Sequence, residues 1–146
     1  MATVSTYLNF TRECEQAFNY YKSVFGGEFF GDGPMRFRDM PPQEGMPTLQ
    51  EDDQNLVVHI ELKITGGYSL MGSDCPESMG IQIKKGNNVH INLQIDTRAE
   101  SDRLFNALSD GGEVSMPMSD QFWGDYFGAC TDKFGISWMI NCAEKV

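Results

Sequence analysis

The chain has 146 residues, of which 40% are hydrophobic and 22% charged, as expected for one globular domain that buries a core without disulfides or a structural metal. Its formal charge of −10 comes from 11 Lys and Arg against 21 Asp and Glu, with no basic cluster to offset it. So acidic a chain repels phosphate backbones, and we expect no nucleic acid among its partners.

Two further classes are disfavoured by what the sequence lacks. No apolar run approaches the roughly 18 residues of a membrane span, and no basic segment leads into an apolar one at the N-terminus. We therefore expect a cytoplasmic protein with no membrane partner. The four cysteines form no C-x-x-C pair, so we expect free thiols, mostly buried, rather than a disulfide framework or a zinc knuckle.

The first part of the chain predicts a strand followed by a helix. Residues 3–10 are rich in β-branched and aromatic residues, which favours a strand. Apolar residues then recur at spacings of three and four up to Phe25, the pattern of an amphipathic helix with one buried face. Thr11 is the predicted N-cap, and the Gly-Gly pair after Phe25 ends the helix. Residues 28–30 are expected to begin a second strand.

Residues 31–55 show no periodicity. They contain four of the six prolines and the acidic run Glu51-Asp52-Asp53. So long an irregular segment is uncommon inside a compact domain, and we interpret it as a lid or a mobile insertion. The alternative is an ordinary surface loop.

Two strands with one polar face each are predicted next. Residues 57–64 alternate between apolar and polar side chains, and residues 68–73 follow after a Gly-Gly turn. The polar faces of the two strands carry His59, Glu61, Lys63, Ser69, Met71 and Ser73.

The second half repeats this order. Residues 89–95 alternate again, and the Asp-Thr pair after them predicts the N-cap of a second helix. A strand at 114–118 is followed by 121–134, QFWGDYFGACTDKF, which predicts a hairpin leading into a closing strand at 136–142. The polar face of the predicted strand at 89–95 carries His90, Asn92 and Gln94.

The order is thus βαβββ twice, in modules of about 3–74 and 88–143 within a single domain. The two helical segments align at a single offset, and a Gly-Gly-Glu trio follows each of them. We predict an α+β fold with two open, curved sheets, each with a helix on one face, whose free faces line a cleft.

Short fragments along the chain carry a family resemblance. In order they are YLNF, YYKSVFGGEF, VHIELKI, YSLMGSD, RLFNALSDGGEV, FWGDYFG and TDKFG. In sequence and order they resemble the PhnB-like branch of the vicinal oxygen chelate superfamily, which includes glyoxalase I, bleomycin-resistance proteins and extradiol dioxygenases. The resemblance implies two βαβββ modules forming curved mixed sheets with a cleft, a small-molecule ligand and a two-fold homodimer.

The resemblance also implies where a metal would bind. Metal-dependent members take a His, Gln or Glu from the first and the fourth strand of each module. The internal repeat places Thr6, Met71, His90 and Met139 at these positions. Only His90 is a competent ligand for a hard or borderline ion. Shifting the alignment by one residue would give Tyr7, Leu70 and Trp138 or Ile140, which are no better as ligands. We therefore expect no metal cofactor, the alternative being a divalent metal that involves His90.

The candidate ligand-binding residues are those expected on the free sheet faces and on the aromatic hairpin. They are His59, Glu61, Met71, His90, Asn92, Phe122, Trp123 and Met139. His59 and Glu61 orient substrate or exchange protons in one interpretation, and form a solvent-facing polar pair in the other. Phe122 and Trp123 either stack on a ligand or pack in the core or at a dimer interface.

Two functions remain open. One is a metal-free small-molecule-binding protein, similar to the drug-binding resistance proteins. The other is a metal-assisted lyase, isomerase or dioxygenase with a rearranged site of His59, Glu61 and His90. No catalytic residue is identified from spacing.

Overall fold

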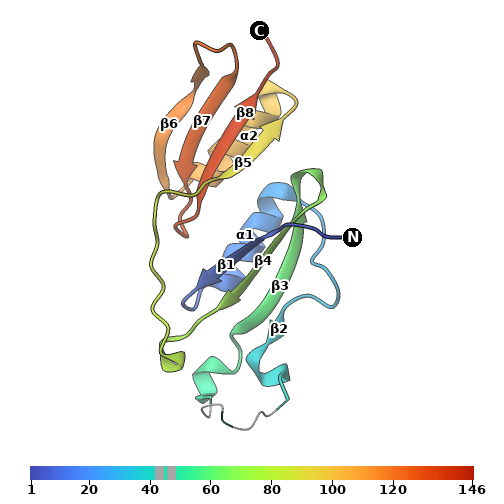
Figure 1. The fold of residues 1–146 in the computed structure, drawn as a ribbon, viewed down its shortest axis with the longest axis vertical. Coiled ribbons are helices and arrows are strands. Elements are labelled where there is room, and N and C mark those ends of the chain that lie inside the picture. Colours follow the sequence, from blue (N-terminus) through green and yellow to red (C-terminus); the bar gives the residue numbers. More distant parts are fainter. Residues whose placement is uncertain (42–44, 46–48) are drawn as a thin grey trace. The chain divides into compact units, whose positions relative to one another are not determined.

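The computed structural model describes residues 1–41, 45 and 49–146. The chain divides into two compact units, Met1–Lys84 and Lys85–Val146, and each contains one of the predicted modules. In both units a strand and a helix are followed by three further strands (Figure 1).

The first unit is a four-stranded mixed sheet with one helix. Its elements are β1 (Thr6–Phe10), α1 (Cys14–Phe25), β2 (Met35–Arg36), β3 (Val57–Ile64) and β4 (Tyr68–Asp74). The strand order is β1-β4-β3-β2, in which β1 runs parallel to β4 and the other pairs are antiparallel.

The second unit repeats that topology. Its elements are β5 (Ile91–Ile95), α2 (Arg98–Ser109), β6 (Glu113–Asp120), β7 (Tyr126–Thr131) and β8 (Ser137–Cys142). The strand order is β5-β8-β7-β6, again with one parallel pair. The predicted α+β fold of two open four-stranded sheets is confirmed. Within the described residues, neither helix is long and apolar enough to cross a membrane.

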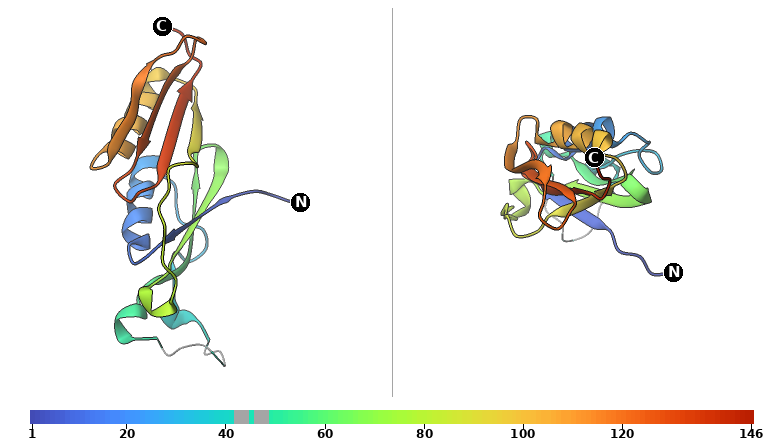
Figure 2. Two further views of the ribbon diagram at one scale, coloured as in Figure 1. Left: turned by 60° about the vertical axis from the view of Figure 1, so that its left-hand side comes forward. Right: turned by 90° about the horizontal axis from the view of Figure 1, so that it is seen from above.

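One face of each sheet is packed against the helix of the same unit (Figure 2). In the first unit, Leu62 and Leu70 are buried on this face. In the second unit, Trp138 is fully buried, as its position in the strand alternation predicts. Its indole Nε1 donates a hydrogen bond to Asp132 Oδ2 at 2.9 Å.

The backbone N–H groups at the N-termini of the two helices find hydrogen-bond acceptors in two different ways. Thr97 caps α2 as predicted, its side chain accepting from the N–H of Glu100. The predicted cap of α1, Thr11, is wrong. The N-cap position belongs to Glu13, and the N–H of Cys14 is bound at 2.9 Å by the carboxylate of Asp74, sixty residues along the chain.

The second strand also lies elsewhere than predicted. Phe29 forms only an isolated bridge to Leu62, whereas β2 begins at Met35. Glycines with positive φ at 26, 27, 31 and 33 flank this bridge on both sides and turn the chain away from the extended backbone that a longer strand would need.

The segment 31–55 is partly ordered by polar anchors. It contains short 3₁₀ turns at Phe37–Asp39 and Glu51–Asp53. The buried carboxylate of Asp53 accepts hydrogen bonds from Arg12 at 2.7 Å and from Ser78 at 2.6 Å. Residues 42–44 and 46–48 lie outside the described residues, so the lid or mobile insertion stays a prediction.

Candidate ligand-binding site

Three side chains form a row across the helix-free face of the first sheet. Tyr7 on β1 pairs in register with Met71 on β4, which in turn pairs with Glu61 on β3. Their strand neighbours Leu62 and Leu70 are buried on the opposite face, and alternation therefore turns this row away from α1. Met71 and Glu61 are half-buried although no helix of their unit covers them.

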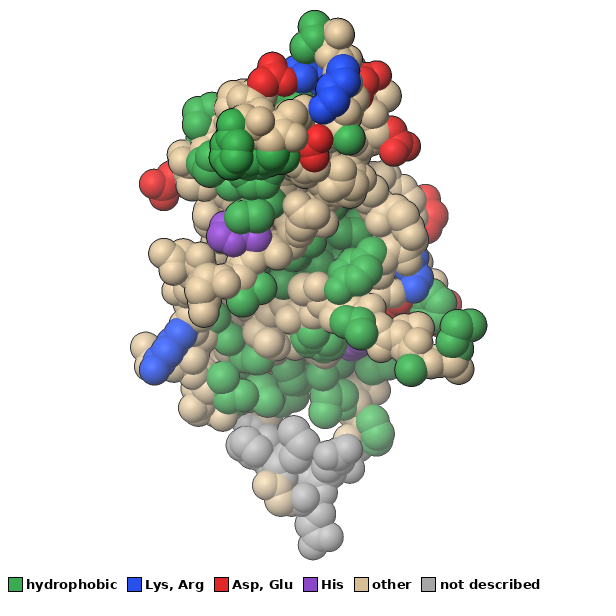
Figure 3. All heavy atoms as spheres, turned by 45° about the horizontal axis from the view of Figure 1, so that its top comes forward, with side chains coloured by type: hydrophobic (Ala, Val, Ile, Leu, Met, Phe, Trp, Pro, Cys, Tyr) green, Lys and Arg blue, Asp and Glu red, His purple; other side chains and the backbone are tan. Residues whose placement is uncertain are grey.

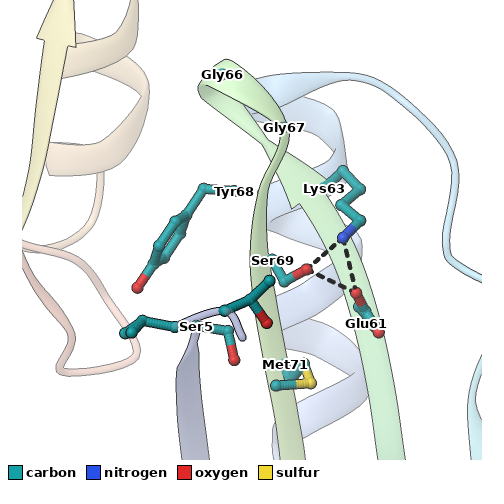
Figure 4. A pocket seen from close by; sticks show the side chains of 10 residues that line it. Ser5, Glu61, Lys63, Gly66, Gly67, Tyr68, Ser69 and Met71 are labelled. Atoms are coloured by element: carbon teal, nitrogen blue, oxygen red, sulfur yellow. Dashed lines mark hydrogen bonds and ion pairs between the residues drawn. The ribbon is translucent and has the colours of Figure 1, made fainter. Parts of the chain in front are cut away.

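A hollow of about 490 Å³ opens beside this row, and we call it the Glu61 hollow. Its wall combines residues 3–5, which precede β1, with the Gly-Gly turn between β3 and β4. The side chains that contribute are Glu61, Lys63, Tyr68, Ser69 and Met71 (Figure 4). Charged, hydroxyl and apolar groups thus share one concave surface, as in most small-ligand sites.

A hydrogen-bonded cluster forms the polar part of the wall. Ser69 Oγ donates to Glu61 Oε2 at 2.7 Å, and Lys63 Nζ lies 3.2 Å from the same oxygen and also bonds Ser69 (Figure 4). The Glu61 side chain is 16% exposed and that of Lys63 50%. The Ser69 hydrogen bond, more than the Lys63 ammonium, lowers the pKa of Glu61 despite its burial.

This environment determines what Glu61 does chemically. A carboxyl with a lowered pKa stays ionised at neutral pH and is a weak proton acceptor, so it is poorly suited to general-base work. The same ionised group is a good hydrogen-bond acceptor for a ligand. The cluster therefore favours binding over proton transfer.

His59 lies on the same strand as Glu61 but does not line the Glu61 hollow. Its Nδ1 is 3.4 Å from the hydroxyl of Tyr7, and the two rings lie 5.8 Å apart. The structure thus gives His59 a partner of its own, separate from the cluster of Glu61.

The helix-free face of the second sheet carries amides and a thioether. Asn92 on β5 pairs in register with Met139 on β8, and Met139 pairs with Ala129 on β7. Asn92 is exposed and Met139 half-buried. His90 is half-buried and immediately precedes β5.

The aromatic pair of the predicted hairpin lies in the turn between β6 and β7. The ring of Trp123 is 5.1 Å from that of Phe122 and 5.9 Å from that of Phe127. Phe122 is 97% exposed and Trp123 50%, which excludes packing in the core of their own unit. Hydrophobic side chains reach the protein surface in several groups, as the space-filling view shows (Figure 3).

Comparison with known proteins identifies the family. Residues 4–140 match the model of the Glyoxalase/Bleomycin resistance protein/Dioxygenase superfamily. The protein belongs to this superfamily. Protein YjdN of Escherichia coli K12 is 29% identical over 97% of this chain and 96% of its own length.

Solved structures agree with this assignment. Protein PA1353 of Pseudomonas aeruginosa is 34% identical over 99% of this chain and 100% of its own, with a TM-score of 0.82. A Bacillus cereus PhnB protein, described as a putative 3-demethylubiquinone-9 3-methyltransferase, shares the fold at 24% identity and a TM-score of 0.73, over 97% of this chain and 100% of its own. The resemblance to PhnB-like members is confirmed.

The strand register corrects the repeat alignment used for the superfamily's metal positions. Thr6 faces Leu70, and the corresponding pair in the second unit is Ile91 with Trp138. Thr6 therefore corresponds to Ile91 and not to His90. The cause is local: three residues separate β1 from α1, whereas two separate β5 from α2.

On the first strands of the two units, the residues that pair in register with Met71 and Met139 are Tyr7 and Asn92. These four side chains do not suit a borderline divalent ion. A phenol, an amide and two thioethers include neither the imidazole nor the carboxylate that a borderline divalent ion prefers. Among the residues that the structure describes, no group of three or more His, Cys, Asp or Glu side chains could hold a metal ion.

Sequence reasoning missed part of the Glu61 hollow. Lys63 and Ser69 lie on the polar strand faces that the alternation predicts but are not among the predicted site residues, because alternation alone does not distinguish a side chain that lines a hollow from one that faces solvent. The signal that could have found them is register: a tight turn between β3 and β4 pairs Lys63 with Ser69, two residues from Glu61. Residues 3–5 gave no such signal.

Proposed function

We propose that this protein binds a small organic molecule in the Glu61 hollow and does so without a resident divalent metal. The observation that carries the proposal is a hollow whose wall holds a prearranged cluster of Glu61, Ser69 and Lys63. Membership of a superfamily that includes bleomycin-resistance proteins supports a binding role.

The size and lining of the hollow support the same proposal. Its volume of about 490 Å³ lies within the range of roughly 300–1,000 Å³ typical of small-molecule sites. The cluster fixes polar groups before a ligand arrives, so less conformational entropy is lost on binding. Met71 supplies an adaptable apolar surface beside them.

Two serines on one strand provide a matched test. Ser69 and Ser73 lie on the same face of β4, but only Ser69 lines the hollow. A fragment library is screened by ligand-observed NMR against the wild type and against the variants Ser69→Trp and Ser73→Trp. We expect hits on the wild type and on Ser73→Trp that are lost in Ser69→Trp, whose indole fills the hollow. Hits that survive equally in both variants would place binding elsewhere.

The metal-free part of the proposal has its own test. Protein purified without chelator is analysed for zinc, iron, manganese and nickel, beside a His90→Ala variant. We expect substoichiometric metal in both, because the register set of Tyr7, Met71, Asn92 and Met139 offers no imidazole or carboxylate. Stoichiometric metal that is lost in His90→Ala would favour the metal-assisted lyase, isomerase or dioxygenase.

We also propose that two copies associate as a homodimer. The edge strand β6 exposes Val114 and Met116, and exposed apolar groups on a sheet edge are commonly covered by a partner. Light scattering at micromolar concentration should give about twice the monomer mass of 16.4 kDa. A Met116→Lys variant should shift this mass toward the monomer, and a monomeric wild type would refute the dimer.

A further inference from the structure

The two charges in the Glu61 hollow each keep bonding capacity that the described residues do not use. Glu61 accepts both Ser69 and Lys63 on Oε2, and its Oε1 accepts no hydrogen bond from the described residues. An ammonium has three N–H donors, and the two described partners of Lys63 are Glu61 and Ser69. One acceptor and one donor of opposite charge therefore remain available, close together.

The charge balance of the lining selects among ligands. Glu61 and Lys63 are the charged side chains that line the hollow, and their charges cancel. A ligand anion at Lys63 would also face the carboxylate of Glu61 and a protein of formal charge −10. A ligand cation at Glu61 would face the Lys63 ammonium. A molecule that carries both charges meets an opposite charge on each side.

We infer, on the basis of the proposed function, that the ligand class of this hollow is a small zwitterion of the amino-acid type with an apolar body. Its ammonium donates to Glu61 Oε1, and its carboxylate accepts from Lys63 Nζ. An α-amino acid carries these two groups on one carbon, so they lie as near each other as the paired charges of the protein. The apolar body contacts Val4, Tyr68 and Met71, which supply the aliphatic, aromatic and thioether side chains of the wall.

Three probes that share a phenyl ring on a two-carbon chain test this inference. L-Phenylalanine carries both charges, 2-phenylethylamine keeps only the ammonium, and 3-phenylpropanoate keeps only the carboxylate. Each is titrated to millimolar concentration into ¹⁵N-labelled protein, and the dissociation constant is taken from amide shifts of residues in the hollow. L-Phenylalanine should bind about tenfold or more tightly than either single-charge probe, the difference expected for one charged hydrogen bond.

Variants that each remove one charge of the hollow show which protein side chain recognises the ammonium of the ligand and which recognises its carboxylate. Glu61→Gln should abolish the preference for L-phenylalanine over 3-phenylpropanoate, since the ammonium then has no carboxylate partner. Lys63→Gln should abolish the preference over 2-phenylethylamine. The matched controls are Glu28→Gln and Lys22→Gln, which break an ion pair of 3.3 Å in the same unit but outside the hollow. Both controls should keep the wild-type preference.

The outcomes separate this inference from the function on which it rests. Binding of all three probes with equal affinity, or a preference that Glu61→Gln and Lys63→Gln leave unchanged, overturns the zwitterion and leaves the hollow as a binding site. If none of the probes shifts the hollow residues, the inference also fails. The fragment screen with Ser69→Trp and Ser73→Trp then decides separately whether the hollow binds anything.

Discussion

In the first unit the N-terminus of α1 is held by Asp74, a residue of the last strand, whereas in the second unit Thr97, directly before α2, caps the helix itself. Asp74 also accepts the N–H of Val57 at 2.9 Å and so ties helix, β3 and β4 together. At the register position of Asp74 the second sheet carries Cys142. Two units with the same topology thus provide a hydrogen-bond acceptor for the backbone N–H groups at the helix N-terminus in different ways. One uses a carboxylate distant in sequence, and the other uses the hydroxyl of the residue just before the helix.

The cores of the two units differ in a second, complementary way. The residue that pairs with Leu8 in the first sheet is Gly72, and an added Cβ there would lie 2.5 Å from the Phe18 ring. In the second sheet Leu93 pairs with Ile140, a buried side chain. In the first unit the ring of Phe18 on the helix occupies the space beside the glycine, whereas in the second unit the strand residue at this position carries a large side chain of its own. The same register position is therefore packed by different residues in the two units.

The helix-free faces differ most. The first carries the paired charges of Glu61 and Lys63 with a hydroxyl between them, while the second carries Asn92 and Met139. Because these faces do not hold the sheet to its helix, their side chains are free to diverge without loss of the fold. This difference is the reason for placing the ligand in the first unit.

The largest expected effect tests the remote cap. Asp74→Ala should lower the free energy of unfolding by about 2–4 kcal/mol, because the buried N–H groups of Cys14 and Val57 lose their acceptor. Burial raises the pKa of Asp74, so the cost of desolvating the carboxyl offsets part of its benefit. Thr97→Ala should cost only about 1 kcal/mol, as usual for an N-cap. Urea denaturation of both variants measures the difference, and equal losses would contradict the role of Asp74.

An intermediate effect tests the packing around Gly72. Gly72→Ala should destabilise the protein by about 1–3 kcal/mol, because the new methyl overlaps the ring of Phe18. The same substitution in a Phe18→Leu background should cost less, since the smaller side chain leaves room. A cost that is identical in both backgrounds would show that Phe18 is not the neighbour that forbids a larger residue.

The smallest effect concerns the aromatic turn of the second unit. Trp123→Ala should cost only about 1 kcal/mol of stability, because the half-exposed indole loses little more than its contacts with Phe122 and Phe127. Thermal melting and a ligand titration are measured side by side. Weakened binding by about 1–3 kcal/mol with little change in melting would make Trp123 a stacking residue. A loss of about 3–5 kcal/mol in stability would instead reveal an interface that buries it.

The sequence predicted the fold because its evidence is local and periodic. The alternation of residues 57–64 and the helical spacing up to Phe25 specify the buried faces without knowledge of distant contacts. The Asp74 cap was missed because sixty residues separate it from Cys14, and no spacing rule connects them. The linker between β1 and α1 is one residue longer than the linker between β5 and α2. An alignment of the two modules based on their helices therefore matches Thr6 with His90, whereas the strand register matches Thr6 with Ile91.

The candidate site was predictable only in part. Glu61 and Met71 were selected from strand parity, and both line the Glu61 hollow. The hollow itself depends on how residues 3–5 approach the turn between β3 and β4, a contact between segments about sixty residues apart. Parity also selected His59, which lies on the same face but outside the wall.

Amide NMR of the labelled protein with a fragment hit measures most directly which unit binds. We predict that the largest shifts fall on Glu61, Lys63, Ser69 and Met71, that they persist in Ser73→Trp and that they vanish in Ser69→Trp. Largest shifts at Asn92, Met139 and Trp123, unaffected by Ser69→Trp, would contradict the placement of the ligand in the first unit.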